Sequence, residues 1–155
     1  QEYFINSLNS IEKNVLLKIH AEFNASFQDW FETLISDETI TSRLDETFTP
    51  YIIQNGQKTT FENLSGGEKT SMSLAYRLGL NKVISDFMSK INTKDLLILD
   101  EPTDGFSASQ LDKIRDVLDK IPAKQVIIVS HEPKLESFVE EIIRVNKTGH
   151  VTNVA

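Results

Sequence analysis

The sequence predicts an α/β protein, with a mostly parallel sheet flanked by helices and one long helix in front of it. Residues 4–35 contain no proline or glycine and carry apolar side chains at helical spacing. Farther along the chain, the short apolar runs 96–99 and 125–129 alternate with a helical pattern over 109–120. Alternation of strand, helix and strand is typical of a parallel sheet with crossover helices.

Composition narrows the class of protein. With 155 residues, 39% of them hydrophobic and 25% charged, the chain has the size and balance of one globular domain with a real core. It has no run of about 18 apolar residues and no signal-like amino terminus, which favours an intracellular protein without membrane spans. The absence of cysteine excludes disulfides and cysteine-based zinc sites from this chain. A net charge of -7 excludes general coating of DNA, so a nucleic acid would need a local basic patch.

The first predicted element is the helix over 4–35. Its first apolar positions alternate steps of four and three, as in a coiled-coil seam. We expect this helix to continue upstream in a longer protein, so that residues 1–36 form a coiled-coil base and residues 37–155 form a lobe. The apolar positions are Phe4, Leu8, Ile11, Val15, Ile19, Phe23, Phe27, Trp30 or Phe31, and Leu34.

A β-region and a second helix follow. Residues 47–54 and 57–61 predict two strands, and the Asn-Gly pair at 55–56 favours a two-residue hairpin turn between them. Ser65 then begins a helix that should end near residue 90.

The remainder of the chain alternates between strands and helices. Continuous apolar runs predict strands buried on both faces. The predicted elements are a strand at 96–99, a helix at 109–120, a strand at 125–129, a short helix at 134–141, and a closing hairpin made of 142–145 and 150–154.

The motif Ser65-Gly66-Gly67-Glu68 has two interpretations. As a capping box, Ser65 and Glu68 satisfy each other's backbone N–H groups, and the motif only begins a helix. As an anion site, Gly66 and Gly67 remove side chains where backbone N–H groups converge at the positive end of a helix, which suits the terminal phosphate of a nucleotide. Ser65 would then add a hydroxyl donor.

Two carboxylates follow the predicted strand at 96–99. Asp100 and Glu101 would lie at the carboxyl edge of a parallel sheet, where ligands bind in such folds. Adjacent acids repel each other and therefore need different tasks. Asp100 would hold Mg²⁺ through water, and Glu101 would orient and deprotonate an attacking water. The alternative is a plain acidic turn after a strand.

Three further polar residues are candidates for the site because of their positions in the predicted elements. His131 ends the strand that comes one helix after Asp100, so the two strand ends should be neighbours; by itself, such a histidine is more often a solvated loop residue. Lys69 and Arg77 lie eight residues apart on the second helix, which places both on one side. Spacing alone favours solvated surface residues for this pair.

The chain contains no GxxxxGK[ST] phosphate loop, so we interpret its motifs as half of a nucleotide-hydrolysing site. In this order the motifs resemble the carboxyl-terminal half of an ABC-type ATPase. The long helix and the missing Walker A half resemble the split head of chromosome-maintenance ATPases. The matching segments are Leu64 to Glu68 (signature motif), Leu96 to Asp100 (Walker B strand), Glu101 (catalytic glutamate) and His131 (switch histidine).

Two stretches narrow the resemblance to the Rad50/SbcC family of double-strand-break repair ATPases. They are the Leu-Asp-Glu-Pro-Thr run ending at Thr103 and the Val-Ser-His-Glu run ending at Glu132, and the similarity extends over about 61–145. It implies ATP and Mg²⁺ as cofactors, with two heads enclosing two ATP molecules. Two alternatives stay open: a head of another chromosome-organising ATPase without a nuclease, and a non-hydrolysing lobe that only binds a partner.

The resemblance also implies a role for each site residue. Residues 65–68 would form the site for the γ-phosphate bound by the opposite protomer, with Ser65 and Gly67 touching it, while Asp100, Glu101 and His131 would serve the nucleotide of their own protomer. Lys69 and Arg77 match basic positions that couple nucleotide state to lobe rotation.

The implied partners are the Walker A lobe, a second head, an Mre11-type nuclease at the base of the long helix, and double-stranded DNA, with no membrane. The protein would associate with chromosomes in the cytoplasm or nucleus, and a zinc hook would lie at the coil apex, outside this chain.

One stretch departs from the family pattern. After Pro102-Thr103 the family usually has a leucine-aspartate step, whereas this chain continues with Asp104-Gly105-Phe106-Ser107. The acid that normally crosses the dimer is therefore not at position 107, and Asp104 is the candidate to replace it.

Overall fold

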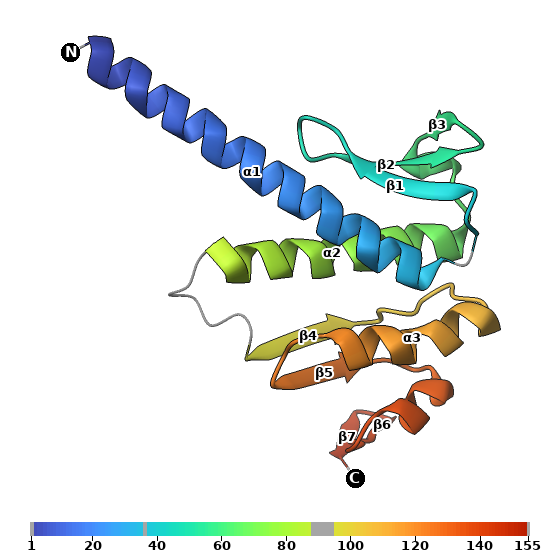
Figure 1. Cartoon of the computed structure of the whole chain (residues 1–155). Helices are drawn as coiled ribbons and strands as arrows, with labels where there is room; N and C mark the ends of the chain where they lie inside the picture. Colours follow the sequence, from blue (N-terminus) through green and yellow to red (C-terminus); the bar gives the residue numbers. More distant parts are fainter. Residues whose placement is uncertain (1, 36, 88–94, 155) are drawn as a thin grey trace.

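The computed structural model describes residues 2–35, 37–87 and 95–154. Helix α1 (Glu2–Leu34) lies across helix α2 (Gly66–Phe87), and a β-hairpin region covers one side of this pair. The strands β4 (Leu96–Asp100) and β5 (Gln125–Val129) lie on the other side with helix α3 (Ala108–Lys120), as Figure 1 shows. No helix in these described ranges is long and apolar enough to cross a membrane.

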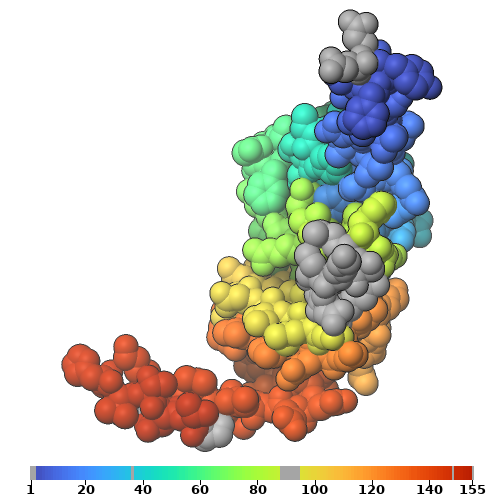
Figure 2. Space-filling view, turned by 90° about the vertical axis from the view of Figure 1, so that its left-hand side faces the viewer, coloured from blue at the N-terminus to red at the C-terminus, as the bar shows by residue number. Residues whose placement is uncertain are grey.

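The predicted long helix is confirmed as α1, and its two halves differ in environment. Phe23, Phe27, Phe31 and Leu34 are at most 1% exposed and pack toward α2 and β1. The first half carries exposed apolar side chains and projects from the body, at the blue end in Figure 2. Those side chains are Tyr3, Phe4, Ile5, Leu8, Ile11, Val15, Leu16 and Leu17.

The predicted hairpin is confirmed, and the structure adds a third strand to it. Strands β1 (Ile40–Leu44), β2 (Pro50–Gln54) and β3 (Gln57–Thr59) form an antiparallel sheet in the order β1-β2-β3. Asn55 and Gly56 have φ values of 50° and 77°, the left-handed conformation that a tight two-residue turn needs.

The strand predicted over 47–54 is shorter than expected, because Phe48 belongs to a turn. Its φ is 64°, and the Asp45 carboxylate accepts hydrogen bonds from the backbone N–H groups of Thr47 and Thr49 at 2.9 and 2.8 Å. These bonds close the turn, so the strand begins only at Pro50. The Phe48 carbonyl accepts a hydrogen bond from the Tyr76 hydroxyl on α2 at 3.2 Å, which fastens the turn to the core.

Helix α2 provides the centre of the core. Its apolar positions Met72, Ala75, Leu78 and Val83 are all buried, as the helical spacing predicts. Phe87, the last described residue of the helix, is exposed, and the part predicted over 88 to about 90 lies outside the described residues.

Strands β4 and β5 pair in parallel with α3 as the connection between them, which confirms the predicted strand–helix–strand unit. The parallel portion is smaller than expected. Among the described residues it is this one pair, and the strands of the other two sheets are antiparallel.

The prediction that these strands are buried on both faces is wrong for this chain. Leu99 is 4% exposed, whereas Ile98 is 60% and Val129 is 52% exposed. Helices of this chain therefore cover one face of the pair and leave the other open.

The end of the chain differs from the prediction in its details. The short helix expected at 134–141 is a 3-10 helix, η2 (Pro133–Phe138), which Pro133 begins and the Glu132 carboxylate caps. The closing hairpin is confirmed, but β6 (Val145–Thr148) starts three residues later than expected and pairs with β7 (Val151–Val154). This hairpin extends away from the body in Figure 2, so packing against the core does little to determine where its strands begin and end.

The two halves of α1 should differ sharply in their contribution to stability. Phe27→Ala removes a fully buried ring and should lower the free energy of unfolding by about 3–5 kcal/mol. Phe4→Ala, in the exposed half of the same helix, should change it by less than about 0.5 kcal/mol. Urea unfolding followed by circular dichroism measures both, and equal effects would contradict the assigned core.

Candidate functional site

The tip of α2 is formed by a capping box, which is one of the two interpretations of this motif. The Ser65 backbone N–H donates to Glu68 Oε2 at 2.8 Å, and the Glu68 backbone N–H donates to Ser65 Oγ at 3.3 Å. The Ser65 hydroxyl also donates to Glu68 Oε2 at 2.8 Å. Ser65 and Gly66 are exposed, so the positive end of the helix faces outward and is accessible to a neighbouring molecule.

The two glycines at the tip, Gly66 and Gly67, have different surroundings. A Cβ added at Gly66 would meet nothing within 4 Å, so this position leaves open space beside the helix end. A Cβ at Gly67 would overlap the Gln110 side chain, and Gly67 itself is buried. Gly66 therefore suits the approach of an anion, whereas Gly67 permits close packing between α2 and α3.

The carboxylates lie at the end of β4, where the parallel pairing places them beside the end of β5. Asp100 is opposite Val129, and the Glu101 backbone N–H donates to the Val129 carbonyl at 2.8 Å. Glu101 has a φ of 44°, a left-handed conformation that costs a non-glycine residue on the order of 1 kcal/mol. Strained backbone of this kind is typical of functional sites.

Glu101 and His131 are brought together, as the order of the strands predicts. Glu101 Oε2 lies 3.1 Å from His131 Nδ1 and accepts a hydrogen bond from the Ser130 hydroxyl at 3.3 Å. The hydrogen bond to His131 and its charge lower the pKa of Glu101, and the same hydrogen bond and charge raise the pKa of His131. At neutral pH the Glu101 carboxylate is therefore ionised beside a histidine that gains a proton easily.

A hollow of about 300 Å³ lies between the acidic residues at the end of β4 and the two basic residues of α2. Lys69 and Arg77 both line it, together with Asp100, Glu101 and Asp104. The eight-residue spacing thus does place both cations on one side of the helix, facing the acids.

Asp100 fits a magnesium ligand in chemistry and position, because it offers an exposed carboxylate at the strand edge. The described residues contain no group of three or more histidine, aspartate or glutamate side chains that could enclose a metal. Mg²⁺ at Asp100 would thus take its other ligands from water and phosphate oxygens, as Mg²⁺ usually does in nucleotide sites.

The loop at 104–107 lies against the tip of α2. The Thr70 hydroxyl donates to the Asp104 carbonyl at 2.7 Å, and Gly105, with a φ of 74°, packs over the Gly66 backbone. Ser107 is the N-cap of α3, in a second capping box with Gln110. Position 107 therefore begins a helix here, and the Asp104 side chain remains exposed.

Sequence reasoning missed three residues that hold the site together. Thr70 and Ser130 lack any pattern of their own, and only the fold brings them to Asp104 and Glu101. Gln110 did have a signal, because Ser-x-x-Gln before an apolar run is a capping-box pattern.

Comparison with known proteins gives a consistent relationship. No family model matches the chain. The DNA double-strand break repair Rad50 ATPase of Archaeoglobus fulgidus is 31% identical over 161 residues, covering 99% of this chain and 17% of that protein. The protein of the same name from Sulfurisphaera tokodaii is 32% identical over 158 residues, covering 99% and 16%. The chain thus spans about a sixth of the length of these relatives.

Solved structures agree on the fold. The Smc head domain of Pyrococcus yayanosii, determined with a coiled coil and joint, has a TM-score of 0.78 at 19% identity and covers 99% of this chain and 30% of that one. The Smc head domain of Pyrococcus furiosus with an extended coiled coil, bound to the C-terminal domain of ScpA, has a TM-score of 0.75 at 20% identity, covering 99% and 39%. By sequence and by fold, the chain is a Rad50/SMC-like C-terminal ATPase lobe.

Proposed function

We propose that this lobe binds and hydrolyses ATP at the interface between two heads and thereby controls a nuclease-associated complex for double-strand-break repair. The grouping of Asp100, Glu101 and His131 at neighbouring strand ends, with Glu101 and His131 3.1 Å apart, carries this proposal. The phosphate loop would come from the amino-terminal lobe of the same ATPase, so the lobe acts only in combination.

Glu101 is the proposed general base for the attacking water. The side chains of Ser130 and His131 both contact its Oε2, which fixes the orientation of the carboxylate at the strand end. Its lowered pKa keeps it ionised, so it orients the water first and accepts the proton as the reaction proceeds. Asp100 would hold Mg²⁺, which when bound neutralises charge on the phosphates.

The tip of α2 is proposed to meet the γ-phosphate held by the opposite head. The exposed Ser65 and Gly66 supply the hydroxyl and the open backbone for this contact. In the present structure the Ser65 hydroxyl donates to Glu68, so binding would exchange that bond for one to phosphate. Gly67 and Glu68 support the tip, through packing on Gln110 and through the capping box.

Lys69, Arg77 and Asp104 are proposed to sense the nucleotide state. All three line the hollow that also contains Asp100 and Glu101. Charges on the nucleotide would change the balance between these cations and acids, and α2 would carry the change toward α1.

The exposed surfaces are proposed to hold the other partners. The apolar first half of α1 would form the coiled-coil base, with the lobe proper beginning near residue 37, and would bind an Mre11-type nuclease. The open face of β4 and β5 would be covered by the Walker A lobe. Double-stranded DNA would bind the assembled heads, so the protein would associate with chromosomes.

A second candidate is a head of a chromosome-organising ATPase without a nuclease. The structural similarity to Smc heads favours it, and the Rad50 sequence relatives favour the first. Binding of an Mre11-type nuclease to α1, lost on replacing Phe4 and Leu8 with glutamate, would decide for the repair ATPase. A non-hydrolysing lobe is disfavoured because the Asp100-Glu101 pair is intact.

Glu101→Gln tests the catalytic assignment. In heads reconstituted with the Walker A lobe, this variant should bind ATP normally, lose at least about 100-fold in kcat, and accumulate as an ATP-bound dimer on size exclusion. Glu136→Gln, in an exposed ion pair with Arg144, is the matched control and should turn over normally. Near-normal turnover by Glu101→Gln would remove Glu101 from its role.

Ser65→Arg tests the contact in trans. The larger cationic side chain should block the exposed tip from a second head, so ATP-driven dimers should disappear while a single head still binds ATP. Gln57→Arg adds the same charge on the exposed strand β3 and should leave dimerisation intact. Dimers that form with Ser65→Arg would disprove the trans-phosphate assignment.

The Glu101–His131 pair should show itself in a pH titration. Because the pKa of His131 is raised in the folded protein, the residue should titrate above its ordinary value, and the ionic form of the pair should be lost as pH rises through that raised pKa. NMR of the imidazole should show this midpoint falling in Glu101→Gln and unchanged in Glu136→Gln. A His131 midpoint that does not respond to Glu101→Gln would contradict the pairing in solution.

A further inference from the structure

We propose that the first turn of α3 ties the tip of α2 to the loop that carries His131, with Gln110 and Lys134 as the positioning residues. This inference rests on the proposed function, since it links the surface meant for the opposite head to the acids of the same chain. Its basis is a continuous set of hydrogen bonds among described residues.

Gln110 forms the first half of the tie. Its Oε1 accepts from the Ser107 backbone N–H at 3.0 Å, and its Nε2 donates to Ser71 Oγ at 3.2 Å. Ser71 is fully buried in α2, and the Gln110 side chain packs directly on Gly67. One planar amide thus joins the start of α3 to α2, one turn past its tip.

The loop between the two helices is held at further points. Thr70 Oγ donates to the Asp104 carbonyl at 2.7 Å, and Gly105 packs over Gly66. The backbone of 104–107 thus contacts α2 directly at two places, and the Ser107 N–H adds an indirect link through Gln110, which bonds to Ser71. A displacement of the tip therefore moves this loop and the start of α3.

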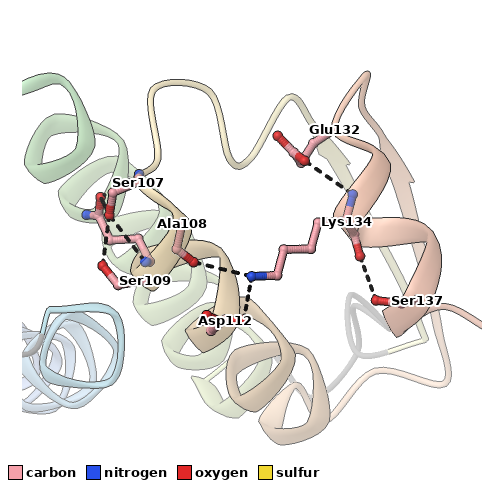
Figure 3. A network of polar contacts seen from close by, with 8 residues as sticks. Ser107, Ala108, Ser109, Asp112, Glu132, Lys134 and Ser137 are labelled. Carbon is pink, nitrogen blue, oxygen red and sulfur yellow. Dashed lines mark hydrogen bonds and ion pairs between the residues drawn. The ribbon is translucent and has the colours of Figure 1, made fainter.

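Lys134 forms the second half of the tie, as Figure 3 shows. Its Nζ lies 2.5 Å from Asp112 Oδ1 and donates to the Ala108 carbonyl at 3.4 Å, both in the first turns of α3. The Lys134 backbone N–H donates to Glu132 Oε1 at 3.2 Å. This lysine therefore fastens the beginning of η2 to α3.

From η2 the bonds lead back to the catalytic carboxylate. The Glu132 backbone N–H donates to Ser130 Oγ at 3.1 Å, and the Ser130 hydroxyl donates to Glu101 Oε2 at 3.3 Å. The path thus runs from the α2 tip through Gln110, α3 and Lys134 to the residues beside Glu101. Position 107 holds a serine that caps α3, and not an acid that could reach across to a second head. The internal path connects the tip of α2 with Glu101 inside one chain.

Two variants break the two halves without touching the proposed catalytic or binding residues. Ser71→Ala removes the acceptor for Gln110 and leaves the capping box of α3 intact. Lys134→Met removes the cation and keeps the aliphatic stem. Their matched controls are Ser42→Ala, also fully buried but with an unpaired hydroxyl in the described structure, and Lys124→Met, in an exposed pair with Asp95.

The variants should be compared in heads reconstituted with the Walker A lobe. Without ATP, Ser71→Ala should speed hydrogen exchange of the amides at 104–107 several-fold. With ATP, both variants should weaken head dimerisation and lower kcat about three- to tenfold, while ATP binding to the undimerised head is unchanged. Because the two halves act in series, the double variant should be no worse than the stronger single variant, and both controls should match the wild type.

Unchanged exchange at 104–107 in Ser71→Ala, or additive losses in the double variant, would overturn the tie. Wild-type dimerisation and kcat in both variants would do the same and leave the proposed function standing. Absence of ATP-driven dimers in the wild type would instead count against the proposed function, and the exchange measurement, which needs no nucleotide, would still decide on the tie.

Discussion

The register between β4 and β5 is the constraint on which the site depends. Asp100 lies opposite Val129, and the next residue on each strand begins the polar cluster. A shift by one residue would turn alternate side chains to the other face of the sheet and separate Glu101 from Ser130 and His131. The bond from the Glu101 N–H to the Val129 carbonyl continues this register past the formal end of the strand and holds the strained backbone in place.

Helix packing supplies the rigid base for this arrangement. The phenylalanines of α1 and the apolar face of α2 form one core, to which Leu99 and α3 add their buried side chains. The tip of α2 is exposed at one end of this core, and the carboxylates are exposed at the sheet edge nearby. Buried packing therefore fixes the spacing between two solvent-facing groups, which a pair of mobile loops could not do.

Much of this was readable from the sequence, because the signals were local. Helical spacing, the Asn-Gly turn, the capping box at Ser65 and the apolar runs each depend on a few neighbouring residues. Strand β1 was not predicted, since its alternation is short and polar residues interrupt it. The open face of β4 and β5 was also not predicted, because apolar composition shows that a strand prefers burial and not which molecule covers it. Bonds such as Thr70 to Asp104 join residues 34 positions apart and leave no local pattern.

The contrast between the two halves of α1 has a mechanical consequence. The helix is 33 residues long, and its contacts with the body begin near its middle, where Ile19 packs against the core and His20 bonds to the Asp45 carbonyl. The projecting portion before Ile19, about 16 residues, reaches roughly 25 Å beyond these contacts. A rotation of about 10° at the anchored end would displace the far end by roughly 4 Å, so a small adjustment among packed rings becomes a visible movement of whatever is attached there. The helix thus acts as a rigid lever that converts a small rotation into a larger displacement, without a hinge within the helix.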